Sequence, residues 1–359
     1  MADDLELKIR KGTPSVQLTR EEFRTRFRAQ FVDPAFDKVS DALEKIEAVA
    51  WDGYHEGRKS PRTRKGGDGF KDPDYDLSVD WLETRAAIAK AKALHDSSEQ
   101  LRMLVVIGSA RNEHTCPGER SKTSRLASEG ADELRAAGCH VDELDLSTLA
   151  GEYGRKIYPC KGCVSTAMPL CHWPCSCYPN HALGQTQDWM NEIYPRWVGA
   201  HGIAIITPVY WYQSPSPLKL MLDRLVCSDG GNPDPSSTHG KDVAKAKAIE
   251  LAGWGYPKHL AGRTFSAIVH GDYAGADTVR RILHDTLVDM DLEPAGVQGD
   301  LDRLIGYLKP YATSHDDLDE DRDLFTEVRN AMKVLVARTQ QLRRGIPRES
   351  DGVREPRPK

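Results

Sequence analysis

The feature that most constrains the fold is a series of short apolar segments that alternates with amphipathic helical patterns from residue 102 onward. The Met-Leu-Val-Val-Ile run at 103–107 is continuous, as is typical of a strand that helices cover on both faces. We expect five strands, at residues 103–107, 140–146, 202–207, 264–270 and within 294–301. Helical patterns lie between them, at residues 123–137, 189–197, 217–226 and 277–290. This alternation predicts an α/β fold, an open doubly wound parallel sheet of five strands with helices on both faces.

The chain before this region has a different character. Thr19 and Glu22 have the spacing of a capping box at the start of a helix, and apolar residues within 39–49 recur at helical spacing. A third helix is expected at about 78–94, and no strand signal appears. These patterns predict that residues 1–100 form a helical and loop-rich N-terminal extension.

The remaining chain is assigned to a sheet domain over residues 101–342. We expect the connection at 227–261 to be irregular, because it is rich in glycine and proline, and the domain to end in a helix at 319–342. Residues 343–359 are charged and contain proline, which predicts a disordered tail.

Composition excludes several functional classes. The 359 residues carry 49 Lys and Arg against 54 Asp and Glu, a net charge of −5, so no general attraction to nucleic acid or to an acidic membrane is expected. No apolar run approaches the ~20 residues of a membrane span. The first residues are acidic and lack the apolar core of a signal peptide, and eight cysteines in a chain of this length favour a reducing compartment. We therefore predict a cytoplasmic protein without a nucleic-acid or membrane partner.

The loop after the first strand has the composition of a phosphate site. It begins with Gly-Ser-Ala-Arg at 108–111 and ends with Ser-Lys-Thr-Ser at 121–124, which leads into a helix. It is not the dinucleotide motif, because Ala110 and Glu113 occupy the second and third glycine positions, and no Gly-Lys-Ser/Thr makes it a P-loop. Hydroxyls, an arginine and the N–H groups of a helix start suit a phosphate monoester, although an ordinary helix cap beside a surface arginine uses the same residues. The candidate phosphate ligands are Ser109, Arg111, Ser121, Thr123 and Ser124.

Two more loops follow strands at the same predicted edge. Thr-Pro-Val-Tyr-Trp-Tyr at 207–212 combines a rigid strand exit with aromatic side chains that can flank a flat ligand. His-Gly-Asp-Tyr-Ala-Gly at 270–275 contains glycines that allow close backbone approach. A packing cluster at a helix or subunit contact, and a structural histidine, are the alternatives. The candidate ligand-contacting residues are Pro208, Val209, Tyr210, Trp211, Tyr212, His270, Gly271, Tyr273 and Gly275.

These segments resemble the flavodoxin-like NAD(P)H-dependent FMN reductases and NAD(P)H:quinone oxidoreductases, which are related to the iron–sulfur flavoproteins. The family pattern has Gly-Ser-x-Arg, then Ser/Asn-Thr-x-x-Leu, and later Thr-Pro-x-Tyr followed by Leu-Lys and Asp-Arg. This chain has Leu-Lys at 218–219 and Asp-Arg at 223–224, but it inserts residues 112–120 into the first loop. The resemblance covers about residues 101–300 and implies a flavodoxin-like fold that binds FMN at the strand ends.

The resemblance also implies an activity. The protein would take hydride from NAD(P)H and pass electrons to a second acceptor, such as a flavin or a quinone, in a ping-pong cycle. The cofactor supplies this chemistry, so we assign no catalytic side chain. Family members commonly form homodimers or homotetramers. The alternatives are a non-catalytic flavodoxin-like electron carrier, although flavodoxins are shorter and more acidic, and a partner-binding protein.

Five of the eight cysteines lie close together in sequence. Cys160 and Cys163 have metal-ligand spacing, and four thiolates are enough for zinc or an iron–sulfur cluster. The iron–sulfur flavoproteins repeat cysteine at two-residue intervals three times, whereas Thr166 stands where the third cysteine would be. Reduced thiols are therefore the favoured hypothesis, and bound metal is the alternative. The cysteines concerned are Cys160, Cys163, Cys171, Cys175 and Cys177.

Overall fold

The computed structural model describes residues 7–116 and 118–346, which form two compact units. The first unit combines the chain up to Ala86 with Tyr158–Asn191 and Gly230–Pro257. The second combines Ala87–Ile157 and Glu192–Asp229 with the chain from Lys258 onward. The predicted division at residue 100 was contiguous, whereas two later segments pack with the N-terminal region. Most of the tail predicted over 343–359 lies outside the described residues.

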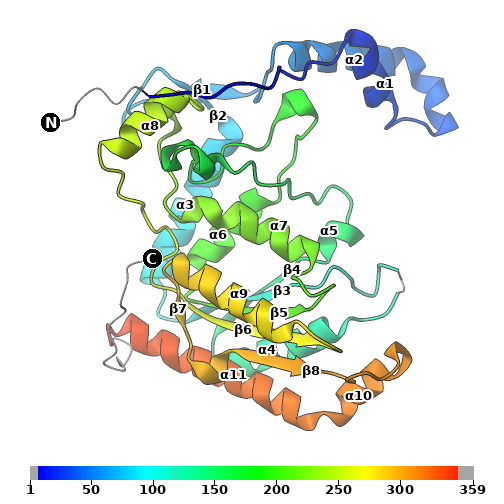
Figure 1. Cartoon of the computed structure of the whole chain (residues 1–359), viewed down its shortest axis with the longest axis vertical. Coiled ribbons are helices and arrows are strands. Elements are labelled where there is room, and N and C mark those ends of the chain that lie inside the picture. Colours follow the sequence, from blue (N-terminus) through cyan, green and yellow to red (C-terminus); the bar gives the residue numbers. More distant parts are fainter. Residues whose placement is uncertain (1–6, 117, 347–359) are drawn as a thin grey trace. The chain divides into compact units, whose positions relative to one another are not determined.

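The second unit is built on a parallel sheet whose strand order is β4-β3-β5-β6, with β7 and β8 both pairing with β6 (Figure 1). Each described pairing in this sheet is parallel. The strands are β3 (Arg102–Ile107), β4 (His140–Asp145), β5 (Gly202–Pro208), β6 (Thr264–Gly271), β7 (Glu293–Pro294) and β8 (Leu301–Leu304). This confirms the predicted α/β fold with a doubly wound parallel sheet.

The strand order creates a topological switch point beside β3. The chain leaves β3 through a helix to reach β4 on one side, and it then returns to β5 on the other side. The connections that follow β3 and β5 therefore diverge at the carboxyl ends of these strands, where ligands of such sheets bind.

Helices cover both faces of the sheet, as the continuous apolar strands require. Figure 1 shows α4 and α11 on one face and α6, α7 and α9 on the other. Met103, Val105 and Ile107 of β3 share one buried cluster with α4 and α11. The helices are α4 (Lys122–Ala136), α6 (Met190–Gly199), α7 (Ser216–Leu225), α9 (Ala276–Asp289) and α11 (Arg322–Arg343).

One predicted strand is divided in the structure, and one predicted helix begins later than expected. The fifth strand position, expected within 294–301, is filled by β7 and β8, because a short 3₁₀ turn at Val297–Gly299 interrupts the pairing with β6. The helix expected at 319–342 is present as α11, and the short helix α10 (Ser314–Glu320) precedes it. The Asp321 carboxylate caps α11 by accepting a hydrogen bond from the Leu324 N–H at 2.9 Å, which fixes the start of that helix.

The first unit contains helices, turns and a small hairpin. Its helices are α1 (Arg20–Arg28), α2 (Ser40–His55), α8 (Val243–Leu251) and the beginning of α3 (Val79–Ser97), with a short 3₁₀ turn at Pro34–Val39. The predicted capping box at Thr19 and Glu22 is present. The expectation of no strand before residue 100 was wrong, since β1 (Thr63–Lys65) pairs with β2 (Asp76–Ser78). These strands are short and charged and bury only Leu77, so they carry no apolar pattern.

The connection expected to be irregular at 227–261 contains α8. Asp242 caps this helix by accepting a hydrogen bond from the Lys245 N–H at 3.0 Å, and alanine and lysine dominate its sequence. The helix was not predicted, because the glycines and prolines that flank α8 indicated a loop and outweighed the helix propensity of its own residues. The element α5 (Thr148–Gly151), a single turn after β4, completes the helices of the described chain.

Candidate functional site

The predicted site residues lie in the second unit, in three loops that follow parallel strands. The hydroxyl-rich loop follows β3, the aromatic loop follows β5, and the glycine-containing loop follows β6. The Val209 N–H donates to the His270 carbonyl at 2.8 Å, so the last two loops are joined at their start. The loops after β3 and β5 also meet, because the Ser109 and Tyr210 hydroxyl oxygens lie 3.5 Å apart. The fold thus brings all three loops to one edge of the sheet.

Gly108 allows β3 and β5 to approach closely at this edge. A Cβ atom on Gly108 would lie 2.7 Å from the Thr207 Oγ1 atom and 3.1 Å from a Leu218 methyl group. No larger residue fits without displacing the strand end. Directly afterwards, the buried Ser109 hydroxyl accepts a hydrogen bond from the Arg111 N–H at 3.2 Å, which holds the loop in a tight turn.

The start of α4 is organised by its own hydroxyl groups. Ser121 is buried, and its Oγ accepts a hydrogen bond from the Ser124 N–H at 3.1 Å. The Ser124 hydroxyl in turn accepts a hydrogen bond from the Arg120 guanidinium at 3.3 Å. Ser121 is therefore the helix cap, and Ser124 points its hydroxyl to a neighbouring arginine. The first N–H groups of a helix have no partner within the helix, so this end of α4 favours an anion.

Arg111 is the charged group nearest to the turn after β3. Its Nη2 atom donates to the Glu119 carbonyl at 3.2 Å and lies 3.7 Å from the Glu119 carboxylate. Its Nε atom is buried and has no hydrogen-bond partner among the described residues. A buried guanidinium N–H without an acceptor is unfavourable, so this atom marks a place where an anionic ligand would complete the site.

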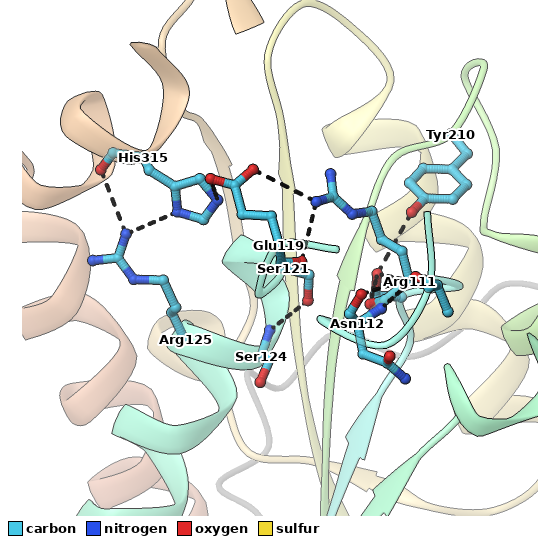
Figure 2. A network of polar contacts seen from close by, with 10 residues as sticks. Arg111, Asn112, Glu119, Ser121, Ser124, Arg125, Tyr210 and His315 are labelled. Carbon is cyan, nitrogen blue, oxygen red and sulfur yellow. Dashed lines mark hydrogen bonds and ion pairs between the residues drawn. The ribbon is translucent and has the colours of Figure 1, made fainter. Parts of the chain in front are cut away.

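The inserted segment 112–120 supplies an acid to this arginine. Figure 2 shows Arg111 and His315 on either side of Glu119, with Arg125 on the far side of His315. His315 lies 3.6 Å from the Glu119 carboxylate, and the Arg125 Nη1 atom lies 3.0 Å from the His315 Nδ1 atom. The insertion therefore keeps the hydroxyl-rich helix start intact and adds an acidic side chain that neutralises part of the Arg111 charge.

His270 is the penultimate residue of β6 and is almost completely buried. Its Nε2 atom is hydrogen-bonded to the buried Thr123 hydroxyl at 2.8 Å. Burial, with a smaller effect of the Lys122 ammonium, lowers the pKa of His270 to about 3. His270 is thus neutral at physiological pH, and it fixes the Thr123 hydroxyl instead of contributing a positive charge. Direct contact between His270 and a cofactor stays a prediction.

The aromatic loop after β5 is a strained two-residue turn. Tyr210 and Gln213 exchange backbone hydrogen bonds of 2.9 and 3.0 Å, and the two residues between them, Trp211 and Tyr212, have φ angles of 48° and 66°. Non-glycine residues in this left-handed region cost about 1–3 kcal/mol each. Trp211 is 93% exposed despite its size. The turn therefore presents aromatic surface to solvent at an energetic cost, as is common at functional sites.

The third loop packs beneath this turn. Gly275 has a φ angle of 94°, and a Cβ atom there would lie 3.1 Å from the Tyr212 Cα atom. Tyr273 is half exposed and stacks parallel to Tyr307, with ring centroids 6.3 Å apart. Glycine is required at 275 both by conformation and by the proximity of the aromatic turn.

Several residues at this edge were not predicted. Lys122 lies in the first turn of α4, where burial and the Arg111 charge lower its pKa while the nearby Asp272 carboxylate raises it. Asp272 also accepts a hydrogen bond from the Tyr311 hydroxyl, which raises the pKa of that phenol. Lys122 adjoins the predicted Thr123 and could have been found by charge. Tyr307 and Tyr311 come from the segment after β8, and no local signal connects them with the site.

The cysteine-rich segment belongs to the first unit. The Sγ atoms of Cys163 and Cys177 are 3.5 Å apart, and their hydrogen bond lowers the pKa of Cys163 and raises that of Cys177. The sulfur of Cys160 accepts a hydrogen bond from the Gly162 N–H at 3.4 Å. Within residues 7–116 and 118–346, no group of three or more His, Cys, Asp or Glu side chains is arranged to hold a metal ion.

Comparison with protein-family models matches residues 101–281, just over half of the chain, to the family described as NADPH-dependent FMN reductase. The chain belongs to the NADPH-dependent FMN reductase family. This confirms the resemblance inferred from the loops after β3 and β5. The match ends within α9 and includes neither the N-terminal extension nor α11.

Comparison with solved structures finds similar chains, of which RosB reaches a TM-score of 0.50. RosB with bound 8-demethyl-8-formylriboflavin-5'-phosphate is 13% identical, with a TM-score of 0.50, over 72% of this chain and 91% of RosB. The apo form of the NADH:FMN oxidoreductase EMOB is also 13% identical, with a TM-score of 0.38, over 70% of this chain and 92% of EMOB. No curated protein sequence gives a significant match. None of the helices in the described chain has the length and apolar character needed to cross a membrane.

Proposed function

We propose that this member of the family is an FMN-dependent oxidoreductase. It takes hydride from NAD(P)H and passes electrons to a second acceptor, such as a flavin or a quinone, in a ping-pong cycle. The observation that carries the proposal is the buried Nε atom of Arg111, which has no partner among the described residues and lies in the loop after β3 at the switch point. Membership of the family supports FMN as the ligand.

The residues around Arg111 fit the terminal phosphate of FMN. The Arg111 guanidinium would donate charge-assisted hydrogen bonds, while the α4 N-terminus and the hydroxyls of Ser109 and Thr123 would supply further donors. His270 fixes the Thr123 hydroxyl before the ligand arrives, which lowers the entropy that binding must overcome. Ser121 and Ser124 act mainly by shaping the helix start.

The loops after β5 and β6 would hold the flavin ring. Tyr210, Trp211 and Tyr212 offer aromatic faces, and Gly271 and Gly275 leave room for the backbone to approach a flat ligand. When bound, FMN supplies the hydride and electron-transfer chemistry, and the chain supplies position, hydrogen bonds and partial exclusion of water. No side-chain acid or base is assigned, and the buried His270 stays neutral.

The oligomeric state is the part of the proposal that rests on the family resemblance alone. We propose that the protein acts as a homodimer or homotetramer, for which the exposed aromatic turn at Trp211 offers contact surface. Cytoplasmic location and the absence of a nucleic-acid partner also stay predictions from composition.

The test combines a spectrum with an anaerobic reaction. The purified full-length chain should show flavin absorption, or acquire it on titration with FMN, and NADPH or NADH should bleach that absorption rapidly without oxygen. A chain that binds FMN but is not reduced by either nucleotide would instead be an electron carrier. Failure to bind FMN at all would contradict the proposal and favour a partner-binding role.

A further inference from the structure

We propose that Cys163 and Cys177, in the first unit, form a site of reversible oxidation at which the two thiols close an intramolecular disulfide. This site is separate from the proposed flavin chemistry and does not depend on it. The decisive geometry is the distance of 3.5 Å between the two Sγ atoms. Formation of a bond of about 2.05 Å therefore requires only a small movement of the two side chains.

The backbone around the pair is suited to such a movement. Cys163 begins a short 3₁₀ turn directly after Gly162, whose φ angle of 62° makes a tight left-handed corner. Both cysteines are partly accessible, so a small oxidant can reach them, whereas Cys171 within the loop between them is buried. The disulfide would join the two ends of the loop at residues 163–177.

Lys59 places positive charge beside one of these thiols, where it lowers the pKa of Cys177. The Lys59 ammonium donates a hydrogen bond to the Ser176 carbonyl, which adjoins Cys177 in the chain. Positive charge near a thiol favours the thiolate, which is the form that attacks a disulfide. Lys59 is therefore a positioning residue that holds charge at the pair.

The oxidant is a low-molecular-weight disulfide, and the reaction is a two-step exchange. The Cys163 thiolate attacks one sulfur of the oxidant, forming a mixed disulfide and releasing one small thiolate. The Cys177 thiol loses its proton and attacks the Cys163 sulfur, which releases the second small thiol. Two protein thiols are oxidised, and one small disulfide is reduced to two thiols.

The structure distinguishes this pair from the pair that spacing alone suggests. Cys160 and Cys163 form the Cys-x-x-Cys sequence, but the Cys160 sulfur accepts a hydrogen bond from the Gly162 N–H, and the Cys163 sulfur contacts Cys177. The thiol that Cys163 contacts is thus one that folding brings to it, not its neighbour in the Cys-x-x-Cys sequence, and the Cys175 thiol, which also hydrogen-bonds to Cys177, is the competing partner.

The experiment maps disulfides in the full-length protein equilibrated in buffers of oxidised and reduced glutathione. After alkylation and proteolysis, mass spectrometry should detect a peptide linked through Cys163 and Cys177, and dithiothreitol should reverse it. The proposal is overturned if both thiols stay alkylated at every ratio, or if the linkage joins Cys160 to Cys163 or Cys175 to Cys177. It is also overturned if the isolated protein holds stoichiometric iron or zinc on these thiols.

Variants sharpen the assignment. Cys160→Ser is the matched control and should retain the linkage, whereas Cys163→Ser or Cys177→Ser should lose it. Lys59→Gln should slow formation of the disulfide by roughly three- to tenfold and move the pH midpoint of Cys177 alkylation upward, because the Lys59 ammonium lowers the pKa of that thiol, and Lys59→Arg should restore both. An unchanged pH profile in Lys59→Gln would overturn the role assigned to Lys59.

Discussion

The edge of the sheet in the second unit and the cysteine-rich segment of the first unit concentrate reactive side chains by different means. At the sheet edge, strand register decides which residues meet, since β3, β5 and β6 end side by side. In the cysteine-rich segment, turns and hydrogen bonds decide it, and Cys163 meets a residue fourteen positions further along the chain. Motifs that follow strands can therefore be predicted from a sequence, whereas contacts within an irregular segment cannot.

The largest expected effect is a loss of folding stability in acid, which both regions should show. Each unit holds a buried histidine whose pKa burial lowers to about 3: His172 in the first unit and His270 in the second. In the unfolded chain the histidine pKa returns to about 6.5. Between pH 6.5 and 3 the unfolded chain therefore binds protons that the folded chain does not bind. Stability should therefore be intact above pH 6.5 and fall as the pH drops toward 3, by on the order of 4 kcal/mol per histidine.

Denaturant unfolding at a series of pH values measures this loss. The free energy of unfolding should fall more in the second unit than in the first, because burial also lowers the pKa of His95, in the second unit, to about 4. Replacement of His270 by Gln should flatten the pH dependence of the second unit only. If His270→Gln reduced the pH dependence of stability equally in both units, the effects of His172 and His270 would not be separate.

The second prediction concerns the anion site alone. Arg111→Ala removes a partly exposed guanidinium whose Nε atom is buried, and loss of a charge-assisted hydrogen bond of about 1.5–3 kcal/mol should weaken FMN binding by roughly ten- to a hundredfold. Calorimetric titration with FMN measures the affinity. Arg135→Ala, at the other end of α4 where Arg135 pairs with Glu143, is the matched control and should bind FMN normally. Unchanged affinity in Arg111→Ala would remove the main support for the phosphate assignment.

A third prediction concerns the strained turn. Trp211→Gly should relieve the left-handed backbone and stabilise the protein by about 1 kcal/mol, while FMN binding weakens because an aromatic face is lost. The melting temperature measured by thermal unfolding should thus rise, while the affinity measured by FMN titration should fall. An unchanged or higher affinity for FMN would show that Trp211 offers no face to the flavin, and a lower stability would show that glycine relieves no strain at this position.

The smallest expected effect comes from the inserted segment. Glu119→Gln removes the carboxylate that lies 3.7 Å from the Arg111 guanidinium. FMN should then bind about two- to fivefold more tightly, because its phosphate no longer competes with this carboxylate for the guanidinium. The effect is small because Glu119 is largely exposed. Glu113→Gln in the same insertion, which lies beside His114, is the control. Weaker binding of FMN by Glu119→Gln would mean that Glu119 helps to position Arg111.

Local sequence predicted much of the fold and the position of the candidate site. The apolar runs of β3 and β5 are buried on both faces, and such strands have few alternative structures. The hairpin of β1 and β2 and the helix α8 were missed, because neither carries an apolar pattern of useful length. Glu119 was missed for another reason, since its contact with Arg111 depends on how the insertion folds back.

The sequence by itself determined the parallel α/β sheet, the hydroxyl-rich and aromatic loops at its edge, and the family. It could do so because burial and turn chemistry act over a few neighbouring residues. Only the tertiary structure decided that His270 holds Thr123, that Tyr307 stacks on Tyr273 and that Cys163 faces Cys177. These pairs join residues distant in the chain, and a contact between distant residues is fixed by packing of the whole unit rather than by local preference.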